Sequence, residues 1–266
     1  MRNSATGWIV AVLWALLFAV ALPAQTTPQS PSGAEAVAAQ SGGAAANLAG
    51  IWMLHAPPGG KIPNYSSTDL SRSELSMTPY GKAKFSQTKP TFGPRAGSIA
   101  DSNEPTFQCF PPGVPAIYTY LYPLQVVPAQ GEVIMLYEYD HQVRHVYTDG
   151  RPHPGDLQPT WMGHSIGHLD GDALVIDTIG FNDKSWLDRF GHPHSEQLHL
   201  TERLQRVGAD LLRIDFTIDD PKTYNQPWTS QLFFQHKPSW GLLEYLCTDN
   251  LKFLNFDKVL NAPSSK

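Results

Sequence analysis

The chain has little cysteine and no concentrated positive charge. Only two of its 266 residues are cysteines, Cys109 and Cys247, and their wide spacing argues against a cysteine-ligated metal. Its 19 lysines and arginines are outnumbered by 24 aspartates and glutamates, and they form no basic run. Because phosphate binding needs a concentrated basic patch, this composition argues against a nucleic-acid partner.

Long hydrophobic runs are also scarce. The one apolar run, Trp8–Val20, is short for a membrane span of about 20 residues. It follows Arg2 and is followed by small residues up to Ala24, the pattern of a secretory signal peptide. We therefore predict a signal peptide over residues 1–24, no stable membrane insertion after cleavage, and a periplasmic or secreted protein.

The two cysteines lie in the part of the chain that would be exported. An even cysteine count in an oxidising compartment favours a disulfide, here between Cys109 and Cys247, that closes a long loop. Two buried thiols are the alternative.

The composition divides the chain into three parts. Residues 25–47 are mostly Ala, Gln, Ser, Gly, Thr and Pro, so we expect a disordered spacer that cannot form a core. Residues 48–266 then form a single β domain. Within it, residues 48–116 form a loop-rich wrap with a short helix near 73–86, and residues 117–250 carry most of the strands.

Alternating and β-branched segments separated by turn residues predict a mostly β fold. Asp170-Gly171 is a strong hairpin signal because glycine tolerates positive φ. Sequential hairpins favour an antiparallel up-and-down meander that closes into a lipocalin-like β-barrel, with a two-sheet β-sandwich as the alternative. We expect strands at 118–127, 133–139, 142–148, 160–169, 173–179, 197–206, 211–218, 228–235 and 242–247.

One pair of strands indicates which face is buried. Leu212, Ile214 and Phe216 alternate with polar residues, so the even positions point inward. The same rule on the neighbouring strand places Glu202 among leucines. An acid in such a core is costly unless it is paired, so Glu202 either meets a basic residue such as Arg144 or lines a polar cavity.

Histidine gathers in one quarter of the chain. Eight of the ten histidines lie between His141 and Glu202, which makes this region the candidate site. Glu202 and His164 are the candidate acid/base pair, with a structural ion pair as the alternative. We expect the polar end of a barrel cavity to be built from Arg144, Trp161, His164, His194, Glu196 and Glu202.

A metal site is a second possibility in this region. His192 and His194, separated by one proline, could chelate an ion together with Glu196. Three such ligands with one open position suit Zn²⁺, and Cu²⁺ also fits. Solvated loop histidines are the alternative.

A serine motif in the same region has the wrong context. Residues Gly163–Gly167 match Gly-x-Ser-x-Gly, which works at a sharp turn between a strand and a helix. Here another strand follows, so we interpret the match as coincidence.

Four longer motifs stand out in the second half of the chain: DGRPHP at 149–154, PTWMGHSIGH at 159–168, DGDALVIDTIGFN at 170–182 and GHPHSE at 191–196. They resemble a family of exported bacterial proteins of acidobacterial type. The resemblance covers most of residues 109–250 and implies export, but it carries no activity. Gly50-Ile51-Trp52 separately resembles the Gly-x-Trp of lipocalin-like barrels.

These observations predict a barrel that binds a small molecule in its interior. A metal-dependent or acid/base enzyme acting with the same residues is the alternative. A third interpretation is an envelope scaffold without a pocket. The ligand, the oligomeric state and the pathway stay open at this point.

Overall fold

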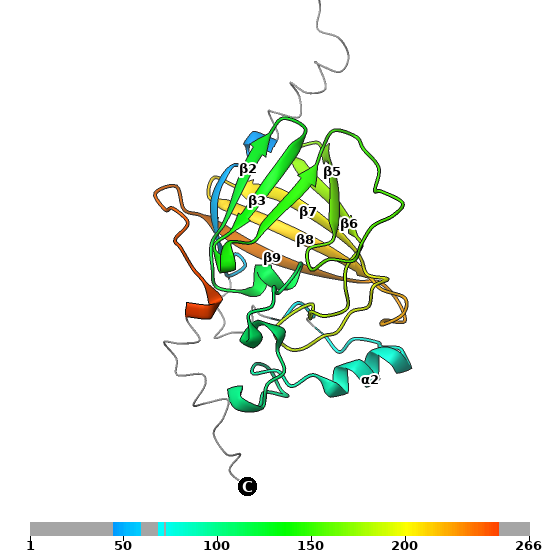
Figure 1. Cartoon of the computed structure of the whole chain (residues 1–266). Helices are drawn as coiled ribbons and strands as arrows, with labels where there is room; N and C mark the ends of the chain where they lie inside the picture. The colour runs from blue at the N-terminus through cyan, green and yellow to red at the C-terminus, as the bar shows by residue number, and fades with distance from the viewer. Residues whose placement is uncertain (1–44, 60–68, 72, 250–266) are drawn as a thin grey trace, which may run out of the picture.

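The computed structural model describes residues 45–59, 69–71 and 73–249, shown in colour in Figure 1. The expected signal peptide and all but the last residues of the expected spacer lie outside the described residues. Within the described part, no helix is both long enough and apolar enough to cross a bilayer.

Nine strands form a closed barrel in which each strand pairs with its neighbours in sequence, and β1 pairs with β9 to close the ring. The predicted fold class is therefore confirmed. The strands are β1 (Gly50–His55), β2 (Leu124–Ala129), β3 (Glu132–Tyr137), β4 (Val143–Tyr147), β5 (His164–Asp170), β6 (Ala173–Ile179), β7 (His199–Gly208), β8 (Leu211–Asp219) and β9 (Trp228–His236).

One pairing departs from a pure antiparallel meander. Strands β4 and β5 run parallel, joined through Val146↔Ser165 and Tyr147↔Ile166. A tight hairpin cannot join parallel strands, so the chain must return along the barrel before β5 begins. The proline-rich segment 148–163 makes that return.

Two expected strands are wrong in part or in full. Of the expected strand 118–127, residues 118–119 belong to a 3₁₀ helix, η4 (Ala116–Thr119), residues 120–123 form no strand, and β2 begins only at Leu124. The tyrosines at 118, 120 and 122 alternate as in a strand, but the Tyr118 side chain is buried and packs in the core of the barrel. Residues 242–247 contain no strand. The barrel still has nine strands because β1, near the start of the described chain, is one of them.

The barrel interior is filled by the inward side chains of its strands. Leu212, Ile214, Phe216 and Ile218 are buried, and Glu202 on β7 is fully buried, so the predicted inward face is correct. The aliphatic and aromatic side chains form one core cluster that also takes in Tyr118.

Loops and short helices cover one end of the barrel, where α2 (Pro79–Gln87) lies (Figure 1). The N-terminus of α2 is capped by Thr78, whose Oγ accepts a hydrogen bond from Gly81 N. The other short helices are η2 (Ile99–Asp101), η3 (Pro105–Gln108) and η5 (Tyr139–His141). The expected disulfide between Cys109 and Cys247 is present, and it ties the last described segment to the end of η3.

Candidate functional site

The polar groups expected at the barrel cavity bind one another. Arg144 forms a bidentate ion pair with Glu202, and its Nη1 lies 2.9 Å from Glu202 Oε1. Tyr118 donates to the same carboxylate oxygen over 2.8 Å, and Arg144 Nε donates to Ser165 Oγ over 2.9 Å. All four side chains are buried, so they face no open space. The expected ion pair is present, and its residues form part of a packed core.

Ser165 is the serine of the Gly-x-Ser-x-Gly match. It lies on β5, is 2 % exposed, and hydrogen-bonds to Arg144 and to Thr178 Oγ. No strand–helix elbow presents it to solvent, which agrees with a coincidental match.

His164 lies on the opposite face of β5 from Ser165, so the barrel wall separates it from Glu202. Its Nδ1 lies 2.8 Å from His153 Nδ1, and His153 Nε2 donates to Asp177 Oδ1 over 2.9 Å. His199 Nε2 donates to the other oxygen of Asp177 over 2.7 Å. We call His153, His164, Asp177 and His199 the outer histidine cluster.

Electrostatics in the outer histidine cluster favours the neutral imidazole of His164 and the ionised carboxylate of Asp177. Burial, and then the neighbouring His153 and Arg151, lower the pKa of His164. Burial raises the pKa of Asp177, but the hydrogen bonds from His199 and His153 outweigh it and leave that pKa below its ordinary value.

The remaining expected residues are dispersed. His194 is 1 % exposed, and its Nε2 lies 2.9 Å from Ser185 Oγ. Glu196 is exposed because β7 begins only at His199 and does not extend back to it. Trp161 stacks on Phe110 with ring centroids 5.6 Å apart. The expected set Arg144, Trp161, His164, His194, Glu196 and Glu202 is thus not assembled around one cavity.

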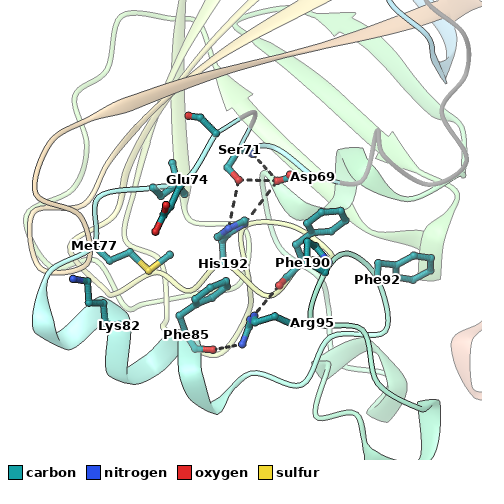
Figure 2. Close-up of a pocket in the computed structure, with 13 residues that line it drawn as sticks. Asp69, Ser71, Glu74, Met77, Lys82, Phe85, Phe92, Arg95, Phe190 and His192 are labelled. Carbon is teal, nitrogen blue, oxygen red and sulfur yellow. Dashed lines mark hydrogen bonds and ion pairs between the residues drawn. The ribbon is translucent and has the colours of Figure 1, made fainter.

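A different pocket lies beside α2, outside the barrel wall. Its volume is about 480 Å³, and Figure 2 shows side chains from α2, from the segment near Asp69 and from the turn before His192 converging on it. We call it the α2 pocket. Its lining combines apolar side chains with polar and charged ones, of which Asp69, Ser71 and His192 lie together. It is lined by Asp69, Ser71, Ser73, Glu74, Leu75, Met77, Lys82, Phe85, Phe92, Pro94, Arg95, Phe190 and His192.

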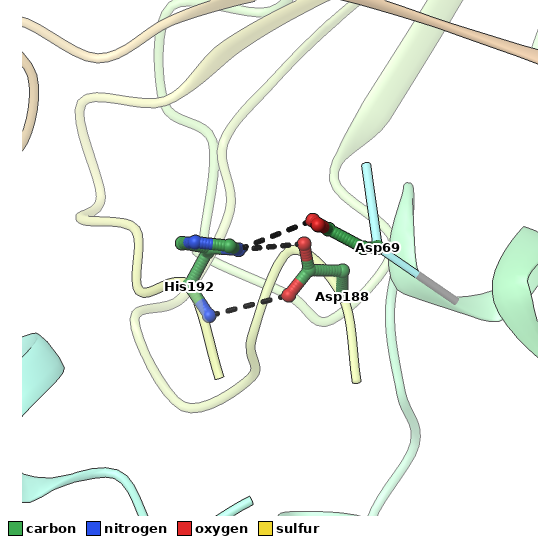
Figure 3. Close-up of side chains that lie close together, drawn as sticks. All are labelled: Asp69, Asp188 and His192. Atoms are coloured by element: carbon green, nitrogen blue, oxygen red, sulfur yellow. Dashed lines mark hydrogen bonds and ion pairs between the residues drawn. The ribbon is translucent and has the colours of Figure 1, made fainter. Parts of the chain in front are cut away.

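Asp69, Asp188 and His192 meet at one side of this pocket (Figure 3). Their ligand atoms all lie within 4.8 Å of one another. His192 Nδ1 is 2.7 Å from Asp188 Oδ2 and 3.9 Å from Asp69 Oδ1. Asp69 and His192 line the pocket, whereas the Asp188 side chain is fully buried behind them.

A tight turn holds Asp188 and His192 in place. The Asp188 carboxylate accepts hydrogen bonds from the backbone N–H groups of Phe190 (3.0 Å), His192 (3.3 Å) and Leu70 (3.1 Å). Gly191 within the turn has φ +84°, and a Cβ there would lie 2.6 Å from Thr88 Oγ1. Phe85 of α2 stacks on the imidazole of His192, with ring centroids 5.0 Å apart.

The ionisable groups at this site shift one another's pKa. Burial, and then the neighbouring Asp188, raise the pKa of Asp69 to about 6. Burial lowers the pKa of His192, but the Asp188 carboxylate outweighs it and raises that pKa above its ordinary value.

Ser71 contacts both Asp69 and His192. Its Oγ lies 3.4 Å from His192 Nε2, so Ser71, His192 and Asp188 follow the order of a serine-hydrolase triad. However, Ser71 Oγ donates its proton to Asp69 Oδ1 over 2.9 Å. His192 does not take that proton here, and Ser71 acts as a support for Asp69.

Sequence reasoning found only His192 of this site. Asp188 stands four residues before His192, a spacing that a search for Asp-x-x-x-His would detect. Asp69 is far away in the sequence and carries no local signal. Comparison with known proteins adds no further residue: no family model, curated protein or solved structure matches the chain.

Proposed function

We propose that the protein binds a small molecule in the α2 pocket. The sequence led us to expect a cavity inside the barrel, but Arg144 and Glu202 are buried and paired there, and the other residues expected around that cavity lie elsewhere. The observation that supports the α2 pocket is a cavity of about 480 Å³ that combines apolar walls with the converging polar groups of Asp69, Ser71 and His192. Volumes of about 300–1,000 Å³ are usual for sites of drug-sized ligands.

The walls and the polar side of the pocket favour a ligand with two parts. Leu75, Met77 and Phe85 offer an apolar surface to a hydrocarbon or aromatic group. Asp69, His192 and Ser71 lie together at one side, where a polar group of the ligand would find hydrogen-bond partners. The ligand class is thus a small amphipathic molecule.

We propose that the protein acts outside the cytoplasm. A disulfide is compatible with an oxidising compartment, and we retain the signal peptide expected over residues 1–24 as part of the proposal. The expected membership in a family of exported bacterial proteins fits the same location. In this location the barrel would serve as a rigid support for the pocket.

The test is the binding of an amphipathic fluorescent dye, such as anilinonaphthalene sulfonate, to the purified protein. We expect saturable binding, and we expect Leu75→Trp to abolish it because a larger side chain fills the pocket. The matched control is Leu243→Trp, in a separate surface groove of about 310 Å³ beside β4. Unsaturable dye binding, or binding lost in the control and kept in Leu75→Trp, would contradict the proposal.

A further inference from the structure

We propose that Asp69, Asp188 and His192 bind a divalent cation at the inner side of the α2 pocket. The inference deepens the proposed function and rests on it, because the cation would anchor the polar group of the pocket ligand. The three residues offer two carboxylate oxygens and one imidazole nitrogen. Such a mixed set suits Zn²⁺ or Mn²⁺ better than Ca²⁺ or Mg²⁺, which prefer oxygen alone.

The distances leave room for an ion. His192 Nδ1 lies 2.7 Å from one carboxylate oxygen and 3.9 Å from the other, and no pair of ligand atoms is more than 4.8 Å apart. A point at a metal–ligand distance of about 2.0–2.4 Å from all three atoms exists within such a triangle. An ion at this point would replace the proton that His192 Nδ1 now shares with Asp188 Oδ2, so metal binding would release a proton.

The surrounding hydrogen bonds are those that a metal site needs. The backbone of Leu70 and Phe190 donates to Asp188, and the backbone and hydroxyl groups of Ser71 donate to Asp69. Ligating histidines usually bond through their second ring nitrogen as well, and His192 Nε2 has Ser71 Oγ at 3.4 Å. These contacts fix the direction of each ligand before an ion arrives.

The balance of charge also favours a cation. Asp69 and Asp188 bring two carboxylates to a site where the Asp188 side chain is fully buried and that of Asp69 is 23 % exposed. A divalent ion would neutralise both. Arg95, which also lines the pocket, donates through Nη1 to Phe85 O and Thr88 O and through Nη2 to Thr88 Oγ1 and Phe190 O, so its charge acts on Asp188 only from a distance.

The open side of the ion would face the pocket. Two of the three ligands, Asp69 and His192, line the α2 pocket, whereas Asp188 lies behind them. Three protein ligands leave at least one coordination position free. A carboxylate or another anionic oxygen of an amphipathic ligand would take that position, while its apolar part lies along Met77 and Phe85.

The first measurement is metal content and affinity. We expect the chelator-treated protein to bind one Zn²⁺ or Mn²⁺ per chain by calorimetry, with Ca²⁺ binding more weakly. Asp69→Asn keeps an oxygen for Ser71 but removes a ligand charge, and we expect it to weaken binding by more than about tenfold. We choose Asp69 because its side chain is half-buried, whereas Asp188 is fully buried and supports the turn. Urea unfolding without metal should give the same midpoint for Asp69→Asn and the wild type.

The outer histidine cluster provides the matched control, because exposed histidines also bind Zn²⁺. His199→Gln, combined with His153→Gln, should leave the affinity and stoichiometry unchanged. If this double variant loses the ion while Asp69→Asn keeps it, the site is on the outer wall and the inference is overturned. Binding of no ion by the wild-type protein overturns it as well.

The second measurement links the ion to the pocket. Zn²⁺ should tighten the binding of 2-naphthoate by about tenfold or more and leave its neutral methyl ester unaffected. If Zn²⁺ changes the affinity for neither probe, the cation does not anchor the pocket ligand, whereas the proposed pocket is unaffected. Binding of neither probe under any condition would instead refute the proposed function.

Discussion

A buried carboxylate inside a hydrocarbon core has to be paired, and Glu202 is paired with Arg144. Both side chains are almost fully buried, at 0 % and 2 % exposure. Removing one partner leaves the other charge buried and uncompensated. We therefore expect Glu202→Gln to lower the free energy of unfolding by about 3–5 kcal/mol, measured by urea denaturation.

The double variant Arg144→Met/Glu202→Leu separates the pair from its packing. It removes both charges, and Ser165 and Thr178 still bond each other over 3.1 Å. We expect it to recover more than half of the loss, because a buried ion pair is often no better than a hydrocarbon pair. A loss below about 1 kcal/mol in Glu202→Gln would instead mean that the side chain reaches water.

His164 allows a pH prediction on the outer wall. Its pKa lies below the ordinary value of 6.5 because of burial and then the neighbouring His153. The folded state thus binds this proton more weakly than the unfolded state does. His164 therefore contributes a loss of stability as the pH falls below about 6.5.

NMR titration of the histidine ring signals checks this shift directly. We expect the His164 midpoint to lie below 6.5 and to rise in His153→Gln, which removes the neighbouring imidazole. Arg213→Gln, on β8, is the control and should leave the midpoint in place. A His164 midpoint above 6.5 in the wild type would contradict the assignment.

At the scale of an element, α2 contains a glycine, Gly81, at a position where helix propensity alone would favour alanine. Alanine usually stabilises a helix by about 1 kcal/mol relative to glycine. A Cβ at Gly81, however, would lie 2.2 Å from the backbone oxygen of Thr223. That oxygen also accepts a hydrogen bond from Thr78 N, so it cannot easily move.

We therefore expect Gly81→Ala to reverse the usual sign and to destabilise the protein by about 1–3 kcal/mol. Because Lys82 and Phe85 of α2 line the pocket, dye affinity should fall too. Ser86→Ala, at an exposed position of the same helix, should be neutral or slightly stabilising. The measurement is chemical denaturation of the wild type, Gly81→Ala and Ser86→Ala. A higher free energy of unfolding for Gly81→Ala than for the wild type would show that α2 can shift away from Thr223.

The elements differ in how far the sequence alone predicts them. Alternation and tight turns such as Asp170-Gly171 predict the strands from β6 to β9, since each pairs with its neighbour in sequence. The parallel pairing of β4 and β5 depends on the path of a 16-residue connection, about which local pattern says nothing. Likewise, the tyrosines of 118–122 alternate like a strand, yet Tyr118 fills the barrel end.

The candidate site shows the same limit at a larger scale. His192 stands out because histidines cluster around it, but its partner Asp69 comes from a segment far away in the sequence. The order of pairing around the barrel and the cover formed by α2 bring the two together. A concentration of histidines therefore located the region, whereas only the assembled fold could separate the outer histidine cluster from the α2 pocket.

At the scale of the whole molecule, one disulfide encloses almost the entire barrel. Cys109 and Cys247 are 138 residues apart, and the loop between them contains β2 to β9. In the chain-entropy model, closing a loop of this length stabilises the fold by about 4–5 kcal/mol, mainly by restricting the unfolded chain. The double variant Cys109→Ser/Cys247→Ser should therefore lose about that much free energy of unfolding.

The control is reduction of the wild-type protein, which should lower the urea midpoint to that of the double variant, whereas the same reductant should leave the variant unchanged. The last segment makes several native contacts of its own. Leu243 N donates to Glu138 Oε2 over 2.8 Å, Tyr245 N donates to His141 Nε2 over 3.2 Å, and the Tyr245 ring lies 4.4 Å from that of Tyr122. None of these contacts involves the cross-link itself, so the loss should come mainly from the unfolded state. Equal midpoints for the oxidised and reduced protein would mean that the reduced unfolded chain is already compact enough to gain nothing from the cross-link.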